Sequence, residues 1–443
     1  MKRLEASAIA QKSSRDFREN YGYSQLDSIA PFERDEIILG RRIGSGAYSF
    51  VYEIAAFCLR LKQSSVYTDE QNEKRKVIAQ SVSKGAKYVM KCLKDDLEHG
   101  EDDGDLFIEA AHDIVNEAEL LAALSHPNII KLHGVVASRH EAFLDGASSF
   151  FIVLERLDCT LADKIEGWAN EKNEESSSLS AFLKPLTSVS GFRSRVHNSG
   201  DVVKLEKSSR FEARARDDGC IEKRFRVAAS LARAVEWLHS KGIIFRDLKP
   251  HNIGFDSKNC LKLFDFGLAR FMPHNGNMSG AGTPRYSAPE GFFFGSANNT
   301  KTDVYSFGVV FWEIMSLKKP FAKCKNRKQL GKALLKVDKV LGISNRRWPK
   351  SIQQVIRKSL SDQSERPTMS EVRTVIDGCI SQGDFSYVPV ITDAFTPKTK
   401  YVALLSAISL NKFTFKHSMS ADSSTTAETF QDSIDGLTQH PID

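Results

Sequence analysis

Apolar and polar residues alternate through residues 37–59, and glycines interrupt the alternation near its middle. The segment reads IILGRRIGSGAYSFVYEIAAFCL. Alternation with a period of two is typical of a half-buried strand, and a glycine-rich break between two such runs indicates a hairpin. A further strand is predicted at Tyr88–Leu93, and two more at IIKLHGVV (129–136) and SFFIVLERL (149–157). The first third of the chain is therefore predicted to form a small sheet.

Helical spacing dominates elsewhere. Within HDIVNEAELLAAL (112–124), apolar residues recur three or four positions apart, and Pro127 stops the pattern. EKRFRVAASLARAVEWLHSKG (222–242) predicts a strongly amphipathic helix that Gly242 ends. The chain then keeps a mainly helical pattern to about residue 380. Strands first and helices later favour a small sheet lobe beside a larger helical lobe, with a ligand in the crevice between them.

Polar stretches separate and flank these elements. Residues 62–84 look like an insertion, and the Ser-, Asn-, Lys- and Glu-rich residues 168–220 are expected to be disordered. The alternative for 168–220, a folded subdomain, stays open. The boundaries that we expect are a flexible N-terminal arm (1–36), an N-lobe (37–157), a C-lobe (158–380) and a C-terminal tail (381–443).

Composition narrows the class of protein. The chain has 443 residues, of which 41% are hydrophobic and 27% charged, as in an ordinary soluble protein. A net charge of +6 is too weak and dispersed to favour a nucleic-acid partner. Seven scattered cysteines predict reduced thiols, and no apolar run reaches the roughly 18–20 residues that span a bilayer. We therefore expect a protein of the cytosol or nucleus with no membrane span.

Two sites in the sheet region could bind phosphate. The glycines of IGSGAYSFV (43–51) would let backbone N–H groups approach phosphate oxygens, although a hairpin without a ligand is common. Lys91 lies in an apolar strand and needs a partner, for which Glu117 on the following helix is the candidate. A purely structural salt bridge is the alternative.

The segment IIFRDLKPHNIGFDSKNCLKLFDFGLAR (243–270) places charge among apolar residues, where desolvation is costly. A short hairpin between Asn252 and Asp265 would fold the carboxylate back beside the amide. These two oxygen ligands suit Mg²⁺ that is bound mainly through nucleotide phosphates. Asp247 would remain outside the metal pair and could accept a hydroxyl proton, with Lys249 beside it. This arrangement is the one that in-line phosphoryl transfer requires.

At these residues the chain resembles the eukaryotic protein kinases, over about residues 37–380 without the two insertions. The resemblance implies an α+β, bilobal fold with a small antiparallel β N-lobe, one key helix and a larger, mainly helical C-lobe. It also implies ATP and Mg²⁺ as cofactors and protein substrates as partners. The matching positions are Gly44, Gly46, Lys91, Glu117, Arg246, Asp247, Lys249, Asn252, Asp265-Phe266-Gly267, Ala288-Pro289-Glu290, Asp303 and Arg366.

The resemblance assigns a role to each matched residue. Asp247, Lys249 and Asn252 would be catalytic, and Asn252 and Asp265 would hold the metal. Asp303 would brace the catalytic loop, and Arg366 would pair with Glu290. The nucleotide would contact Ile43, Gly44, Ser45, Gly46, Ala47, Val51, Lys91, Glu117, the gatekeeper Leu154 and the hinge residues Glu155 and Leu157.

The motif DLKPHN resembles that of Ser/Thr-specific protein kinases. The motifs GTPRYSAPE and TKTDVYSFGVVFWEI are most similar to those of the tyrosine-kinase-like group. A protein Ser/Thr kinase of intracellular signalling is thus the leading interpretation. A pseudokinase that signals as a nucleotide-binding scaffold is the alternative, and a small-molecule or lipid kinase is a weaker one.

Three positions depart from the family pattern. Ser49 replaces the third glycine, which is tolerable if its φ stays negative. Phe245 replaces a usual His and would keep an apolar contact with Phe266. Gly254 replaces a bulky residue under the adenine, which predicts a roomier pocket with either weaker ATP affinity or more tolerance of bulky inhibitors.

Regulation is predicted in the activation segment. By analogy, a phosphate on Ser279 would pair with Arg246 and order the loop, although an unmodified serine is equally consistent with the sequence. Thr283 would support the substrate hydroxyl. Cys159, just past the hinge, would either face the nucleotide or be a buried, inert thiol.

Overall fold

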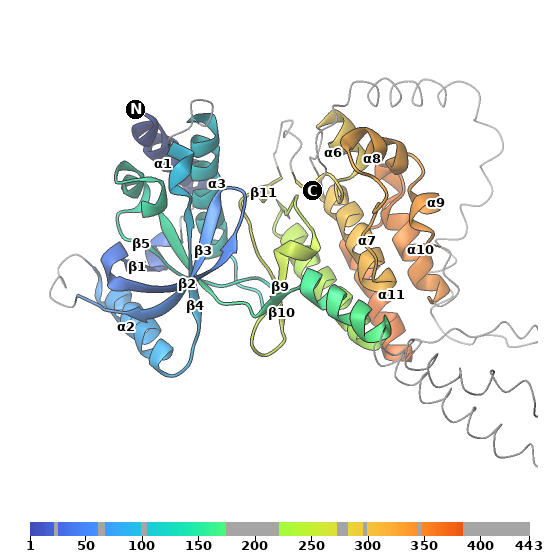
Figure 1. The fold of residues 1–443 in the computed structure, drawn as a ribbon, viewed down its shortest axis with the longest axis horizontal. Coiled ribbons are helices and arrows are strands. Elements are labelled where there is room, and N and C mark those ends of the chain that lie inside the picture. Colours follow the sequence, from blue (N-terminus) through green and yellow to red (C-terminus); the bar gives the residue numbers. More distant parts are fainter. Residues whose placement is uncertain are drawn as a thin grey trace, which may run out of the picture.

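The computed structural model describes residues 1–21, 25–60, 67–98, 104–173, 221–272, 282–295, 299–343 and 348–383. These residues form two lobes, with the strands near the N-terminus in one and most helices in the other (Figure 1). The predicted α+β, bilobal architecture is confirmed.

The N-lobe is built on a 6-stranded sheet in the order β1-β5-β6-β4-β3-β2. Neighbours from β2 to β5 run antiparallel, as predicted, and β1 adds a parallel strand at the edge. The strands are β1 (Ala30–Phe32), β2 (Ile37–Ser45), β3 (Ser49–Phe57), β4 (Tyr88–Leu93), β5 (Leu132–Val136) and β6 (Phe151–Glu155). Register aligns Gly44 with Val51, Val51 with Lys91, and Lys91 with Ile152. The glycine-rich turn and Lys91 therefore lie in one row across the sheet.

Of the expected flexible N-terminal arm (1–36), the structure describes residues 1–21 and 25–36, and these are folded, contrary to the prediction. α1 (Lys2–Tyr21) packs along α3 (Gly104–Ala123) and buries Ala6, Ala10 and Phe17. The spacing of these residues puts them on one face of the helix. Because this face is made mostly of small side chains, it leaves only a weak hydrophobic signal in the sequence.

The insertion predicted at 62–84 contains a folded helix, α2 (Asp69–Ser83), which packs on β1 and β3. Thr68 caps it in a reciprocal capping box with Gln71. Arg75, 2% exposed, extends from α2 to the buried carboxylate of Glu36 at 2.5 Å. The polar sequence of this segment thus forms a helix, α2, which the buried Arg75–Glu36 ion pair holds in place.

The C-lobe surrounds α7 (Thr300–Ser316), whose residues from Thr302 to Met315 are all buried. Helices at residues 161–173 and 221–240 pack with it in this lobe (Figure 1). The remaining helices are α6 (Pro289–Phe294), α8 (Arg327–Leu334), α9 (Val337–Leu341), α10 (Lys350–Ser359) and α11 (Met369–Gln382).

Small strands lie where the lobes meet. β9 (Ile253–Phe255) pairs with β10 (Leu261–Leu263) as the predicted hairpin, and β7 (Cys159–Thr160) joins β9. β8 (Ile243–Ile244) pairs with β11 (Arg270–Phe271). The loop after α3 is joined to β10, because Ile130 N donates to Leu263 O and Leu263 N donates to Asn128 O. The hairpin that carries Asn252 and Asp265 is thereby held against both lobes.

Parts of the expected domain plan are not tested. Of the insertion predicted at 168–220, residues 168–173 complete a helix and 174–220 lie outside the described residues, as does most of the 381–443 tail. Within the described ranges, no helix is both long and apolar enough to cross a bilayer. The cysteines in those ranges are all free thiols.

Candidate active site

The glycine-rich hairpin forms as predicted between β2 and β3. Gly46 N donates to Ser49 O at 2.8 Å and closes the turn, and residues 45–48 are exposed. Ser49 does not have a positive φ, so a side chain is tolerated where the family pattern has glycine. Ile43, Gly44, Ser45, Gly46, Ala47 and Val51 all lie on this hairpin.

Lys91 bridges two carboxylates at the inner end of this row. Its Nζ lies 2.6 Å from Glu117 Oε2 and 2.7 Å from Asp265 Oδ1. Burial alone would lower the pKa of Lys91, but the charges of Asp265 and Glu117 outweigh it and raise that pKa. Lys91 in turn lowers the pKa of Asp265, whereas burial raises that of Glu117 against the opposing effect of Lys91. The predicted Lys91–Glu117 pair is present, and it extends to the metal-ligand candidate.

Asp247 is held by donors on both of its oxygens. Oδ1 accepts from the amide and the hydroxyl of Thr283, both at 2.8 Å. Oδ2 accepts from Lys249 Nζ at 2.7 Å and from Asn252 Nδ2 at 2.9 Å. Lys249 also donates to Thr283 Oγ1 at 2.9 Å. The three predicted catalytic residues and Thr283 therefore form one network around a fixed carboxylate.

Asn252 and Asp265 are brought together by the β9–β10 hairpin. Phe264 N, one residue before Asp265, donates to Asn252 O at 3.0 Å. Asn252 Nδ2 donates two hydrogen bonds, both to Asp247. The Oδ1 of Asn252 is therefore left as the acceptor of this side chain. Asp265 keeps 44% of its side chain exposed while Oδ1 contacts Lys91. An amide oxygen and an accessible carboxylate are hard ligands that fit Mg²⁺.

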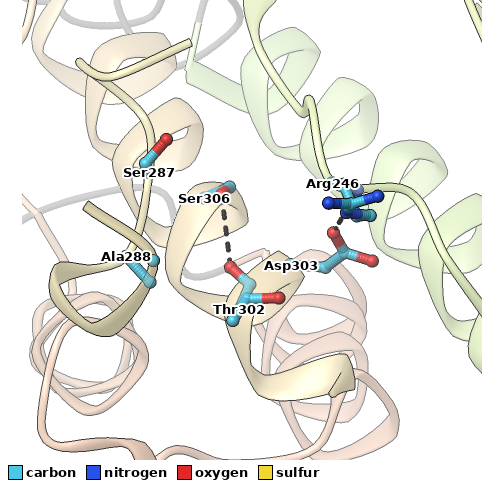
Figure 2. A pocket seen from close by; sticks show the side chains of 7 residues that line it. Arg246, Ser287, Ala288, Thr302, Asp303 and Ser306 are labelled. Carbon is cyan, nitrogen blue, oxygen red and sulfur yellow. Dashed lines mark hydrogen bonds between the residues drawn. The ribbon is translucent and has the colours of Figure 1, made fainter. Parts of the chain in front are cut away.

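Asp303 braces the catalytic loop, as predicted. It accepts from the backbone N–H groups of Phe245 and Arg246 at 2.8 Å each, and His239 Nε2 lies 2.9 Å from Oδ2. Arg246 has a φ of 72°, so these bonds hold a left-handed backbone in place immediately before Asp247. Figure 2 shows the carboxylate of Asp303 directed at Arg246. Both residues line a small cavity of about 10 Å³, together with residues of α7 and with Ser287 and Ala288.

Two more predicted contacts of the C-lobe are present. Arg366 forms a two-point ion pair with Glu290, at 2.5 and 2.8 Å. Phe245 meets Phe266 edge to face, with ring centroids 5.1 Å apart, so the replacement of His keeps the apolar contact. The first contact ties α6 to the segment before α11, and the second packs the residue two positions before Asp247 against Phe266.

The hinge follows β6 and connects the lobes. Leu154 is buried and faces Val89 in the next strand. Glu155 Oε1 accepts from Lys131 N at 2.9 Å and lies 3.1 Å from Lys262 Nζ, so its side chain ties β6 to β10. Cys159 pairs with Phe255 through β7, and burial raises the pKa of its thiol, as expected for an inert cysteine.

The prediction of a roomier pocket at Gly254 is wrong at this position. A Cβ added to Gly254 would lie 2.5 Å from Leu157 Cδ1 and 3.2 Å from Phe264 Cε1. The side chain of Leu157 occupies the space that the glycine leaves. Leu157 therefore belongs to the packing under the hinge as well as to the hinge itself.

Several residues that matter to this geometry escaped the sequence analysis. Asn116 Nδ2 donates to Ala269 O at 3.0 Å, and Arg270 pairs with Asp113 at 2.7 Å, so α3 is tied to the chain after Asp265. Gly282 has a φ of 101°, and a Cβ there would lie 2.4 Å from Arg246 O. The position of Gly282 immediately before Thr283 is the one signal that could have identified it.

Of the predicted regulatory pair, Arg246 and Ser279, the structure describes only Arg246. Arg246 lies beneath the activation segment, where Nη1 is 3.5 Å from Leu268 O and burial lowers its pKa. Ser279 falls outside the described residues.

Comparisons with known proteins agree with this geometry. Residues 37–376 match the family model of protein tyrosine and serine/threonine kinases. A probable serine/threonine-protein kinase of Dictyostelium discoideum is 29% identical over 59% of this chain and 13% of its own length. Leaf rust 10 disease-resistance locus receptor-like protein kinase-like 1.4 of Arabidopsis thaliana is 29% identical over 59% of this chain and 35% of its own.

A third relative, the dual specificity protein kinase shkC of Dictyostelium discoideum, is 32% identical over 35% of this chain and 32% of its own. The chain thus matches 13% to 35% of the length of these relatives. Their names are compatible with the resemblance to the tyrosine-kinase-like group. Because the family model spans well over half of the chain, the protein belongs to the protein tyrosine and serine/threonine kinase family.

Proposed function

We propose that the protein transfers the γ-phosphoryl group of ATP to serine or threonine hydroxyls of protein substrates, in signalling inside the cell. One observation carries this proposal: the carboxylate of Asp247 is fixed by hydrogen bonds from Lys249, Asn252 and Thr283. A carboxylate held in this way can orient an acceptor hydroxyl and take its proton. A scaffold that only binds nucleotide would not need this network.

Asp247 is the residue that we assign as proton acceptor. Lys249 contacts both Asp247 and Thr283, so its charge stands where negative charge develops on the transferred group. Lys91 is held by Glu117 and would orient the phosphates of ATP. The glycine-rich turn would cover them with backbone N–H groups, and the hinge from Leu154 to Leu157 would receive the adenine.

Asn252 and Asp265 are the residues that would hold Mg²⁺. The ion, when bound, would neutralise phosphate charge. The Oδ1 of Asn252 and the exposed carboxylate of Asp265 support this assignment, because Nδ2 of Asn252 is already committed to Asp247. Lys91 keeps Asp265 ionised, since its charge lowers the carboxyl pKa.

Of these three relatives, one is named a serine/threonine-protein kinase, one a receptor-like protein kinase without a stated acceptor, and one a dual specificity protein kinase. The assay must therefore distinguish phosphoserine, phosphothreonine and phosphotyrosine. The purified protein is incubated with γ-labelled ATP and Mg²⁺, alone and with a generic basic protein. Asp247→Asn is the matched control, because it keeps the size of the side chain and removes the proton acceptor.

The expected result is label on serine and threonine with the wild type and a decrease of at least about 100-fold with Asp247→Asn. Label mainly on tyrosine would overturn the residue specificity. No transfer by wild-type protein that still binds ATP would overturn the enzymatic proposal and favour a scaffold.

A further inference from the structure

The N-terminal helix α1 has no part in the proposed reaction, yet one of its faces is completely covered. Ala6 and Ala10 are 0% exposed, and Phe17, at the same face further along, is 6% exposed. α1 runs beside α3, the helix that carries Glu117 (Figure 1). Small residues allow two helices to approach closely, so α1 fits against α3 along much of its length.

α3 is buried on two sides as a result. One side of α3 packs on the sheet at β4 and β5, and the α3 residues Phe107, Ala111, Val115 and Ala118 are at most 2% exposed. Each apolar face of a helix needs a packing partner that covers it. α1 supplies part of that cover, so the position of α3 depends on a segment far upstream of Lys91.

The first turn of α1 is attached near the end of β4. Arg3 Nε donates to Glu98 Oε2 at 2.7 Å, and Glu98 Oε1 accepts from Ala147 N. Glu98 lies in the short helical turn that follows the Lys91 strand. This end of α1 is therefore fixed to the sheet.

The other end of α1 reaches the activation segment. The ring of Phe17 meets that of Phe271 edge to face, with centroids 5.7 Å apart. Phe271 lies in β11, six residues after Asp265. The neighbouring Arg270 pairs with Asp113 of α3 at 2.7 Å. Phe17 thus contacts the same short strand that α3 holds through its own side chains.

We propose that α1 is an intramolecular brace that clamps α3 and β11 together, and that Phe17 is a positioning residue for Glu117 and Asp265. This inference rests on the proposed kinase function for its kinetic consequence, but the clamp is a structural property in its own right. The Lys91–Glu117–Asp265 cluster is complete only when α3 and the segment after Asp265 are both in place. A brace that touches both raises the population of molecules in that state.

The test compares Phe17→Ala and Phe17→Leu with Lys12→Ala in the full chain. Lys12 is an exposed residue of the same helix, so its substitution controls for a change in α1 that leaves the clamp intact. Rates are measured at least about 15 °C below the Tm of each variant, so that the folded fraction is equal. Hydrogen–deuterium exchange of peptides within 104–123 and 265–272 is followed in parallel.

If the brace exists, Phe17→Ala lowers kcat by roughly 3- to 10-fold, the factor expected for loss of an aromatic pair, and changes KM for ATP by less than about 2-fold. Phe17→Leu keeps the apolar contact and recovers part of the rate. Exchange in both peptides becomes faster with Phe17→Ala, whereas Lys12→Ala matches the wild type in every measurement. A loss of stability alone would lower the Tm without lowering kcat per folded molecule.

The two proposals fail in different ways. Unchanged exchange and unchanged kcat in folded Phe17→Ala overturn the brace and leave the kinase assignment intact. Faster exchange without phosphoryl transfer by any variant keeps the clamp and overturns the kinase assignment. If Phe17→Ala does not fold, Phe17→Leu decides, with faster exchange in 104–123 expected and wild-type exchange contradicting the brace.

Discussion

Gly282 is a residue whose importance comes from backbone geometry. Its φ of 101° disfavours any side chain, and an added Cβ would lie 2.4 Å from Arg246 O and 3.5 Å from Asp247 Oδ1. Gly282→Ala must therefore displace either the catalytic loop or Thr283. We expect kcat to fall by more than about 10-fold, since small misplacement of catalytic groups is costly.

Gly342→Ala is the matched control for this prediction. Gly342 also has a positive φ, 63°, but nothing lies within 4 Å of its added Cβ. That variant should lose about 1 kcal/mol of stability from backbone strain and keep its kcat. Equal loss of activity in both variants would contradict the clash with Arg246 as the cause.

Gly254 and Leu157 are predicted to behave as one packing unit. Gly254→Leu places a large side chain where Leu157 Cδ1 already lies, so we expect a loss of about 1–3 kcal/mol in unfolding free energy. The double variant Gly254→Leu with Leu157→Ala should recover most of it, because the second change opens the space. Denaturant unfolding of both single variants and the double variant measures the coupling. Additive losses would mean that the two side chains do not compete.

Glu313 is predicted to make stability depend on pH. Burial raises its pKa to about 7, against the opposing effects of Tyr286, Lys319 and Arg285, whereas the ordinary value is 4.5. Between these values the folded protein binds the proton more tightly than the unfolded chain, so stability falls as pH rises from about 4.5 to 7. This loss of unfolding free energy is complete above pH 7 and is about 3 kcal/mol.

Glu313→Gln removes this dependence and still accepts the hydrogen bond of Tyr286. The variant should therefore unfold at a higher temperature than the wild type at pH 8, and the difference should shrink towards pH 5.5. Thermal unfolding at several pH values measures it. A difference that is constant with pH would show that the carboxyl of Glu313 does not titrate in this range.

At the scale of elements, α2 illustrates how an insertion is anchored. Arg75 and Glu36 are 2% and 1% exposed, and the guanidinium also lies 4.4 Å from the centroid of the Tyr67 ring. Arg75→Met leaves the buried carboxylate of Glu36 without its counter-ion, and we expect the unfolding free energy to fall by about 3–5 kcal/mol. The backbone N–H groups that Glu36 still accepts from reduce this loss.

Removing both charges tests this explanation. The double variant Arg75→Met with Glu36→Gln should be more stable than Arg75→Met alone, because no uncompensated charge remains. Chemical unfolding of the two variants decides it. A double variant that is less stable than the single one would mean that α2 is anchored by packing and not by charge.

The elements that the sequence predicted well are those with strong periodic signals. The β2–β3 hairpin, the Lys91 strand and the helix at residues 221–240 are examples, because glycine breaks, alternation and helical spacing of apolar residues reflect burial directly. α1 could not be predicted in the same way. Its buried face is made of Ala6, Ala10 and one aromatic, and such a stripe is hard to distinguish from a solvated helix or a coil.

At the scale of the whole molecule, the sequence predicted some contacts around the candidate site, such as the Lys91–Glu117 pair and the bonds of Asp303 to the catalytic loop, and missed others. Asp247 and Asp265 could be identified because each stands at a break between short apolar runs, and Asn252 because it lies close behind Asp247. The tie between α3 and the activation segment through Asn116, Asp113 and Arg270 could not, because contacts between 151 and 157 residues apart leave no local pattern. The space beside Gly254 was misjudged for the same reason.

Nucleotide binding should stabilise both lobes together, because the proposed contacts come from the sheet, the hinge and the β9–β10 hairpin. A ligand at 100 times its Kd adds about 2.7 kcal/mol to the stability of the folded state. ADP with Mg²⁺ should therefore raise the Tm of the wild type by a few degrees, and a chelator should remove the part that depends on the metal. Asp247→Asn should keep the full shift, since Asp247 is assigned to proton transfer and not to nucleotide binding. Asp265→Asn should show the same shift with and without the chelator. A shift that depends on Mg²⁺ in Asp265→Asn as strongly as in the wild type would remove Asp265 from the metal site.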